Sequence, residues 1–90
     1  MPVDSLSQAR YLIAMTPNYT LDATGLLCPL PVLKLRKRLK SLSIGDVILL
    51  RADDPAAVID VPHFCAESGH ELISTGEVDG VQTYLIRKTV

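Results

Sequence analysis

The sequence predicts a two-layer α/β sandwich in which two helices cover one face of a mixed four-stranded sheet. Segments typical of strands and helices follow one another in the order β-α-β-α-β-β. The apolar run 47–52 has the length of a buried strand, and Asp79-Gly80 between two strand-like runs is typical of a hairpin turn. With 90 residues, 48% hydrophobic and 21% charged, the chain has the size and composition of one globular domain.

The chain divides into an N-terminal arm and a folded domain. We expect residues 1–19 to form an arm, disordered or a short helix, and residues 20–90 to form the domain. No apolar run approaches the ~20 residues of a membrane span, and the start lacks the layout of a secretory signal. The two cysteines form no disulfide framework. We therefore expect a cytoplasmic protein that does not bind membranes.

The first half of the domain is expected to be a β-α-β unit. A strand at 19–22 leads into a turn at Gly25, and a helix runs from Pro29 to about Lys40. A strand at 47–52 follows the turn Gly45-Asp46. The helix face toward the sheet is predicted from apolar residues at helical spacing, which are Val32, Leu35, Leu39 and Leu42.

The second half is expected to be a helix followed by a hairpin. Asp54 with Pro55 resembles an N-cap followed by a first-position proline. Because Asp60-Val61-Pro62 repeats that signature, we expect the helix to be broken or restarted near Pro62. Gly69 is predicted to end the helix, and strands 71–78 and 81–88 flank the hairpin turn.

Cys28 is the candidate reactive residue because it directly precedes the first helix. Pro29 suits the first helical position and Pro31 also falls in the first turn, so Cys28 is expected at or next to the N-cap. The free N–H groups and the dipole of a helix start favour a thiolate, which predicts a lowered pKa for Cys28 and a poised nucleophile. The alternative is that Cys28 only extends the apolar run before it into the core.

The first helix also carries a cluster of cations without any acid. These are Lys34, Arg36, Lys37, Arg38 and Lys40. An acidic protein surface or a tRNA backbone would be attracted to them, and we expect the cluster to dock a partner. The alternative is a solvated helix face.

We expect the second cysteine, His70 and Asp22 to have structural rather than catalytic roles. Cys65 is expected to be buried and inert. His70 is expected to cap the preceding helix or face solvent, and Asp22 to shape the turn before Gly25. The spacing of Cys28, His63, Cys65 and His70 lacks the pairs typical of zinc sites, so no metal is expected.

The sequence resembles the SirA/TusA family of small sulfur-carrier proteins from about Leu21 to Lys88. The similarity is carried by the C-P-x-P run Cys28-Pro29-Leu30-Pro31 within residues 21–31, by Gly45-Asp46, by Asp54-Pro55-Ala56, by Asp60-Val61-Pro62-His63-Phe64-Cys65 and by Gly69-His70-Glu71-Leu72. This resemblance implies the same fold.

The resemblance also implies a function for Cys28. It would accept sulfur as a persulfide from a cysteine desulfurase or a rhodanese-type protein and pass it to an acceptor protein, in tRNA thiolation, cofactor synthesis or sulfur metabolism. Such a sulfurtransferase-type carrier acts with partner enzymes. Its chemistry resembles thiol–disulfide exchange and needs no cofactor.

A non-catalytic module is the alternative function. A domain of the same fold could bind nucleic acid or a regulatory protein, with Cys28 structural or redox-sensing. The low aromatic content, 4%, argues against stacking on single-stranded nucleic acid. The absence of a neighbouring second cysteine in the sequence argues against a redox sensor.

Overall fold

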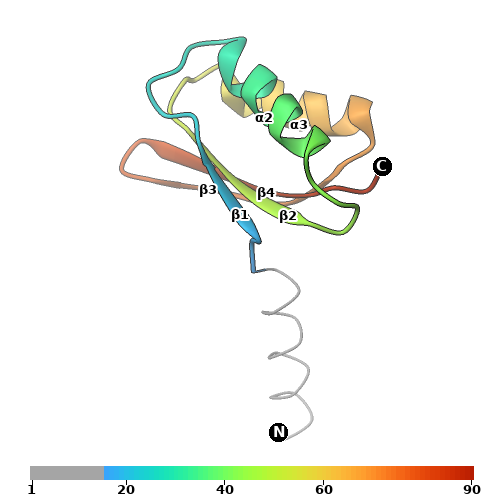
Figure 1. The fold of residues 1–90 in the computed structure, drawn as a ribbon. Coiled ribbons are helices and arrows are strands. Elements are labelled where there is room, and N and C mark those ends of the chain that lie inside the picture. The colour runs from blue at the N-terminus through green and yellow to red at the C-terminus, as the bar shows by residue number, and fades with distance from the viewer. Residues whose placement is uncertain (1–15) are drawn as a thin grey trace, which may run out of the picture.

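The computed structural model describes residues 16–90, which form six elements in the predicted order (Figure 1). These are β1 (Tyr19–Asp22), α2 (Leu30–Lys40), β2 (Val47–Ala52), α3 (Ala57–Ser68), β3 (Glu71–Val78) and β4 (Val81–Arg87). Residues 1–15 of the expected N-terminal arm lie outside the described part. Within the described part, no helix is long and apolar enough to cross a membrane.

The four strands form one mixed sheet in the order β1-β2-β4-β3. β1 pairs with β2 in parallel, and the other two pairings are antiparallel. Both helices lie over the same face of this sheet (Figure 1). The predicted two-layer sandwich is therefore confirmed. Because β1 and β2 are parallel, the segments that follow them begin at the same edge of the sheet.

The core lies between the helices and the sheet. Ile48 and Leu50 of β2 are fully buried, as are Leu35 of α2 and Val61 of α3. On the neighbouring β4, Ile86 pairs with Ile48 and lies on the same face. The predicted apolar face of the first helix is confirmed by the burial of Leu35, Leu39 and Leu42, with Val32 partly buried against the same cluster.

Helix α3 differs from the prediction at its start and in its middle. Asp54 does not cap it, because its carboxylate and carbonyl accept the N–H groups of Ala56 (3.3 Å) and Ala57 (3.0 Å) in a preceding turn. The N-cap is Ala56. The helix is also unbroken at Pro62. The carbonyl that Pro62 leaves without a helical donor belongs to Val58, whose residue is 55% exposed, so water can satisfy it.

The end of α3 and the hairpin follow the prediction. Gly69 has a φ of 83°, in the left-handed region, and donates its N–H to the Cys65 carbonyl at 3.0 Å. Asp79 and Gly80 also have positive φ values, 52° and 80°, as a tight type I′ hairpin turn requires. The last strand ends at Arg87, one residue earlier than expected.

Candidate thiol site at the start of helix α2

Cys28 lies exposed at the end of the loop between β1 and α2. The helix begins one residue later than predicted, because Pro29 is the N-cap and Leu30 the first helical residue. Pro31 therefore occupies the second helical position, and Cys28 directly precedes the cap. The peptide bond between Cys28 and Pro29 is cis. The prediction that the thiol lies next to the N-cap is confirmed.

Two aspartates hold the loop that leads to Cys28. The Asp22 carboxylate accepts the backbone N–H (3.0 Å) and the hydroxyl (2.7 Å) of Thr24, so its predicted role in this turn is confirmed. These hydrogen bonds lower the pKa of Asp22. Gly25 has a φ of 79° and donates its N–H to Asp53 at 2.9 Å. The loop is thereby tied to the segment after β2.

The closest partners of Cys28 are two aspartates that sequence reasoning did not select. The Cys28 backbone N–H donates to the Asp54 carboxylate at 2.6 Å, and Sγ donates to Oδ2 of Asp60 at 2.9 Å. Asp54 follows β2 and Asp60 lies in the first turn of α3. A parallel pairing of β1 with β2 would have predicted this proximity. It brings the segments that follow both strands, and with them Cys28, Asp54 and Asp60, to one edge of the sheet.

The prediction of a lowered pKa for Cys28 is wrong. The hydrogen bond to Asp60 raises the pKa of the Cys28 thiol, and desolvation and the negative charges of Asp60 and Asp54 act in the same direction. The start of α2 has few free backbone N–H groups that could stabilise a thiolate and so lower this pKa. The Leu30 N–H is bonded to the Leu27 carbonyl at 2.8 Å, and Pro31 has no N–H. The free thiol is therefore held in its protonated form.

A cavity of about 240 Å³ opens beside Cys28, between the two helices. It is lined by Cys28, Pro29, Val32, Arg36, Asp60, His63, Phe64 and Glu67. Arg36 lies over the Phe64 ring at 5.5 Å, and His63 and Glu67 are 3.1 Å apart. The lining of the cavity thus combines a thiol, apolar side chains such as Val32 and Phe64, and charged groups of both signs.

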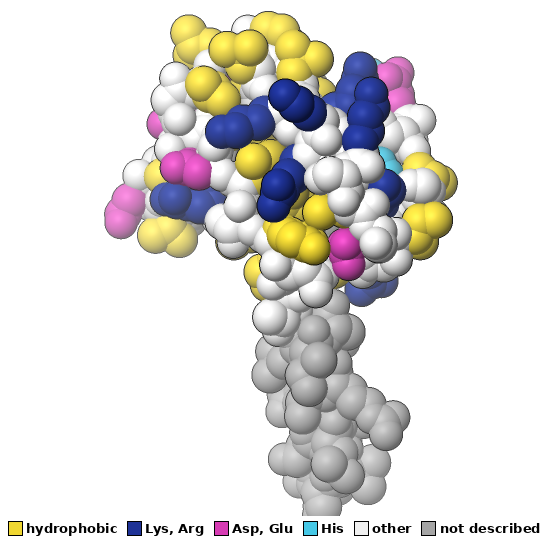
Figure 2. Space-filling model, in the orientation of Figure 1, with side chains coloured by type: hydrophobic (Ala, Val, Ile, Leu, Met, Phe, Trp, Pro, Cys, Tyr) yellow, Lys and Arg dark blue, Asp and Glu magenta, His cyan; other side chains and the backbone are white. Residues whose placement is uncertain are grey.

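The structure divides the predicted basic cluster between different surfaces. Arg36 lines the cavity beside Cys28, whereas Lys34, Lys37 and Arg38 line another cavity next to Leu21 of β1. Lys34 donates to the Asp22 carbonyl at 2.7 Å. Arg38 lies over the Tyr19 ring at 5.2 Å. Figure 2 shows Lys and Arg side chains, in dark blue, spread over the visible face of the domain rather than gathered in one patch.

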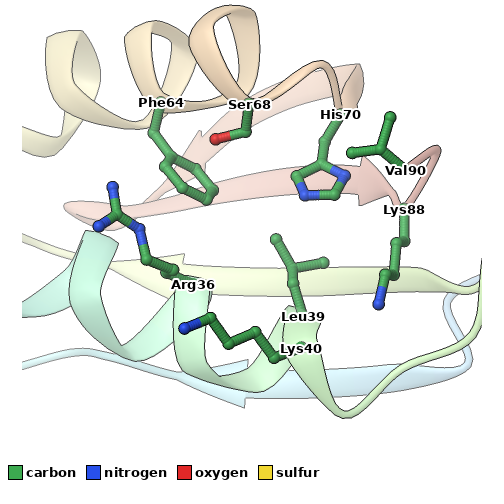
Figure 3. A pocket seen from close by; sticks show the side chains of 8 residues that line it. All are labelled: Arg36, Leu39, Lys40, Phe64, Ser68, His70, Lys88 and Val90. Carbon is green, nitrogen blue, oxygen red and sulfur yellow. The ribbon is translucent and has the colours of Figure 1, made fainter.

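A third cavity lies at the other end of the helix pair. Arg36 and Lys40 line it together with Lys88, His70 and Phe64 (Figure 3). Arg36 and Phe64 therefore border both this cavity and the one beside Cys28. The five cations do not surround the thiol, and Arg36 is the member of the set that lines its cavity.

The remaining expectations concern Cys65, His70 and metals. Cys65 is 2% exposed, and burial raises its pKa to about 11, so its predicted burial is confirmed. His70 does not cap α3; its Nδ1 accepts the Thr89 N–H at 3.3 Å, and burial together with Lys88 lowers its pKa. Among residues 16–90, no group of three metal-ligating side chains gathers.

The family model described as sulfurtransferase TusA matches residues 19–88, which include Cys28 and all six elements. The chain belongs to the TusA family. A crystal structure of a SirA-like protein from Desulfitobacterium hafniense is similar to it, with 26% sequence identity and a TM-score of 0.70. That match covers 80% of this chain and 99% of the other. Membership of the TusA family gives the chain a sulfur-carrier, sulfurtransferase-type role in relays with partner proteins.

Proposed function

We propose that Cys28 is the sulfur-carrying residue of this TusA-family protein and that it carries sulfur as a persulfide. The observation that supports this assignment is the contrast between the two thiols. Cys28 is exposed beside a cavity at the start of α2, whereas Cys65 is buried in α3. A protein donor must bring its sulfur into contact with the accepting sulfur, and Cys28 is accessible to such a contact.

The transfer is a displacement at sulfur, analogous to thiol–disulfide exchange. The Cys28 sulfur attacks the outer sulfur of a donor persulfide, R–S–SH, and the bond between the two donor sulfurs breaks. The products are Cys28–S–SH and R–SH, with the Cys28 proton ending on the departing donor sulfur. An acceptor thiol then removes the outer sulfur by the same displacement. Atoms and electrons balance without any cofactor.

The proposed partners are proteins that carry a reactive cysteine. A cysteine desulfurase or a rhodanese-type protein would be the donor, and another relay protein the acceptor. The cations of α2 would attract an acidic surface of such a partner and increase the rate of encounter. They would also attract a tRNA backbone if the acceptor complex contains one. A reducing compartment such as the cytoplasm would keep Cys28 free of disulfides.

Intact-mass measurement tests the function directly. The protein is incubated with a cysteine desulfurase and cysteine, and a gain of one sulfur atom that dithiothreitol reverses is expected. Cys65→Ala should gain sulfur like the wild type, and Cys28→Ser should gain none. No gain on the wild type with any desulfurase or rhodanese-type donor, together with binding to nucleic acid or a regulatory protein, would favour the non-catalytic module instead.

A further inference from the structure

We propose that the surface around Cys28 fits a protein partner whose reacting sulfur lies beside a positively charged side chain, which pairs with the Asp60 and Asp54 carboxylates. This inference rests on the proposed function, because it names the chemistry of the partner that approaches the same thiol. Its evidence is the local surface: two carboxylates in contact with Cys28 and a border of exposed apolar side chains.

The two carboxylates are placed for such a pairing. Asp60 accepts the thiol hydrogen bond at 2.9 Å, and Asp54 accepts the Cys28 backbone N–H at 2.6 Å. Among the described residues, the ion pairs within 4 Å involve neither carboxylate. Both aspartates are half-buried rather than fully covered. A partner cation that reaches the thiol therefore meets negative charge directly at the reacting atom.

The titratable and charged groups around the cavity beside Cys28 come from both helices, and Asp54 comes from the segment between β2 and α3. Asp60, His63 and Glu67 belong to α3, and Arg36 belongs to α2. His63 and Glu67 pair with each other at 3.1 Å, and Arg36 lies over Phe64. The carboxylates of Asp60 and Asp54 thus remain the charges in direct contact with Cys28. A nucleic-acid phosphate would be repelled at this point, which favours a protein over RNA.

Apolar side chains complete the surface. Leu27, adjacent to Cys28, is 69% exposed, and Ile59, adjacent to Asp60, is 74% exposed. Leu30 and Leu33 of α2 are each 48% exposed. Figure 2 shows yellow side chains gathered over the beginning of α2. Exposed apolar side chains gathered in one place are typical of a surface that binds a protein partner.

Pairing would also change the reactivity of the thiol. In the free protein the Asp60 carboxylate holds the thiol protonated. A cation at Asp60 offsets that negative charge, so the Cys28 sulfur attacks the donor persulfide as its proton passes to the departing donor sulfur. A partner that brings the cation would thus activate the thiol on contact. A reagent without a charge would meet the unactivated thiol.

Small disulfides of different charge test the inference without a protein partner. Cystamine carries positive charges, bis(2-hydroxyethyl) disulfide is neutral and dithiodiglycolate is negative. The rate of mixed-disulfide formation on Cys28 is measured by intact mass at low salt. Each rate is divided by that of 2-mercaptoethanol with the same reagent. We expect the normalised rate with cystamine to exceed that with dithiodiglycolate by about tenfold, and the ratio to fall at high salt.

Matched variants assign the preference to Asp60. Asp60→Asn should lower the ratio about threefold or more. Asp46→Asn removes the same charge from the turn between α2 and β2, where Asp46 accepts the Ser43 N–H at 2.9 Å, and should leave the ratio unchanged. Circular dichroism confirms that each variant is folded. If Asp60→Asn does not fold, the inference is tested on the wild type alone: the ratio of the cystamine rate to the dithiodiglycolate rate should fall as salt is added, and a ratio that does not change with salt would contradict it.

Two results would overturn the inference. One is a wild-type protein that reacts with dithiodiglycolate as fast as with cystamine, which would mean that Arg36 and the other cations dominate the thiol. The other is an equal effect of Asp60→Asn and Asp46→Asn. Both results are independent of the proposed function, because a desulfurase can load sulfur on Cys28 whichever disulfide reagent reacts fastest. If a desulfurase fails to load sulfur but cystamine still reacts faster than dithiodiglycolate, the proposed function is rejected, whereas the inference about the charge preference of this surface stands.

Discussion

Sγ of Cys28 lies 2.9 Å from Oδ2 of Asp60, although 32 positions separate the two residues in the sequence. The contact joins the loop before α2 to the first turn of α3. The Asp60 carboxylate therefore places a negative charge next to the thiol, whereas the dipole of α2 by itself would place a partial positive charge there. The resting protein therefore exposes its thiol while keeping it protonated.

Removing the Asp60 charge should make the thiol more acidic. We expect the alkylation of wild-type Cys28 by neutral iodoacetamide to have its midpoint above the pH of about 8.5 that is usual for cysteine, because Asp60 raises the pKa. Asp60→Asn should move the midpoint to lower pH and speed alkylation at neutral pH. Identical pH profiles for the two proteins would show that the carboxylate does not control the thiol.

Replacing the thiol by a hydroxyl should separate function from stability. Cys28→Ser should abolish sulfur loading, because a serine hydroxyl is not ionised near neutral pH. The change in the free energy of unfolding should stay within about 0.5 kcal/mol, since Cys28 is exposed and the hydroxyl can also donate to Asp60. Urea unfolding followed by circular dichroism measures it, and a much larger loss would indicate a structural thiol.

Two neighbouring cations of α2 should differ in their effect on sulfur loading. Arg36 lines the cavity beside Cys28, whereas Lys37 lines the one next to β1. We expect Arg36→Glu to slow loading by a partner protein about tenfold at low salt, and the matched Lys37→Glu to slow it less. The rates come from intact mass over time. A larger effect of Lys37→Glu would place the partner on the β1 side of α2.

The buried thiol should contribute to stability in a defined pH range. Burial raises the pKa of the Cys65 thiol above its ordinary range, to about 11. Its raised folded pKa gives a contribution that is complete below about pH 9 and is lost as the pH rises through 11. Cys65→Ala should therefore lose less stability over that range. The remaining loss is expected from Tyr84, whose pKa burial also raises.

Gly69 gives a test of the helix end. Its φ of 83° is costly for a residue with a side chain, although an added Cβ would meet only Val90 Cγ1 at an ordinary 3.6 Å. Gly69→Ala should therefore lower the free energy of unfolding by about 1 kcal/mol through backbone strain. Gly69→Asn should lose less, because asparagine tolerates this conformation. Equal losses in thermal unfolding would argue for a steric cause instead.

The sequence by itself determined the elements and their order. Apolar spacing in α2, the Asp79-Gly80 turn and Gly69 act through neighbours in the chain, so local chemistry predicts them. The family follows from the same local motifs, and the family model confirms it. The position of Cys28 before the helix could also be predicted, because Pro29 and Pro31 restrict where a helix begins.

Only the tertiary structure decided the electrostatics of the site. The parallel pairing of β1 and β2, together with the packing of α3 beside α2, brings Asp54 and Asp60 to the thiol. Whether Pro62 breaks α3 was likewise not settled by the local Asp60-Val61-Pro62 pattern, and the structure has an unbroken helix there. A pKa responds to every charge within a few ångströms, and such distances between remote residues exist only after the chain has folded.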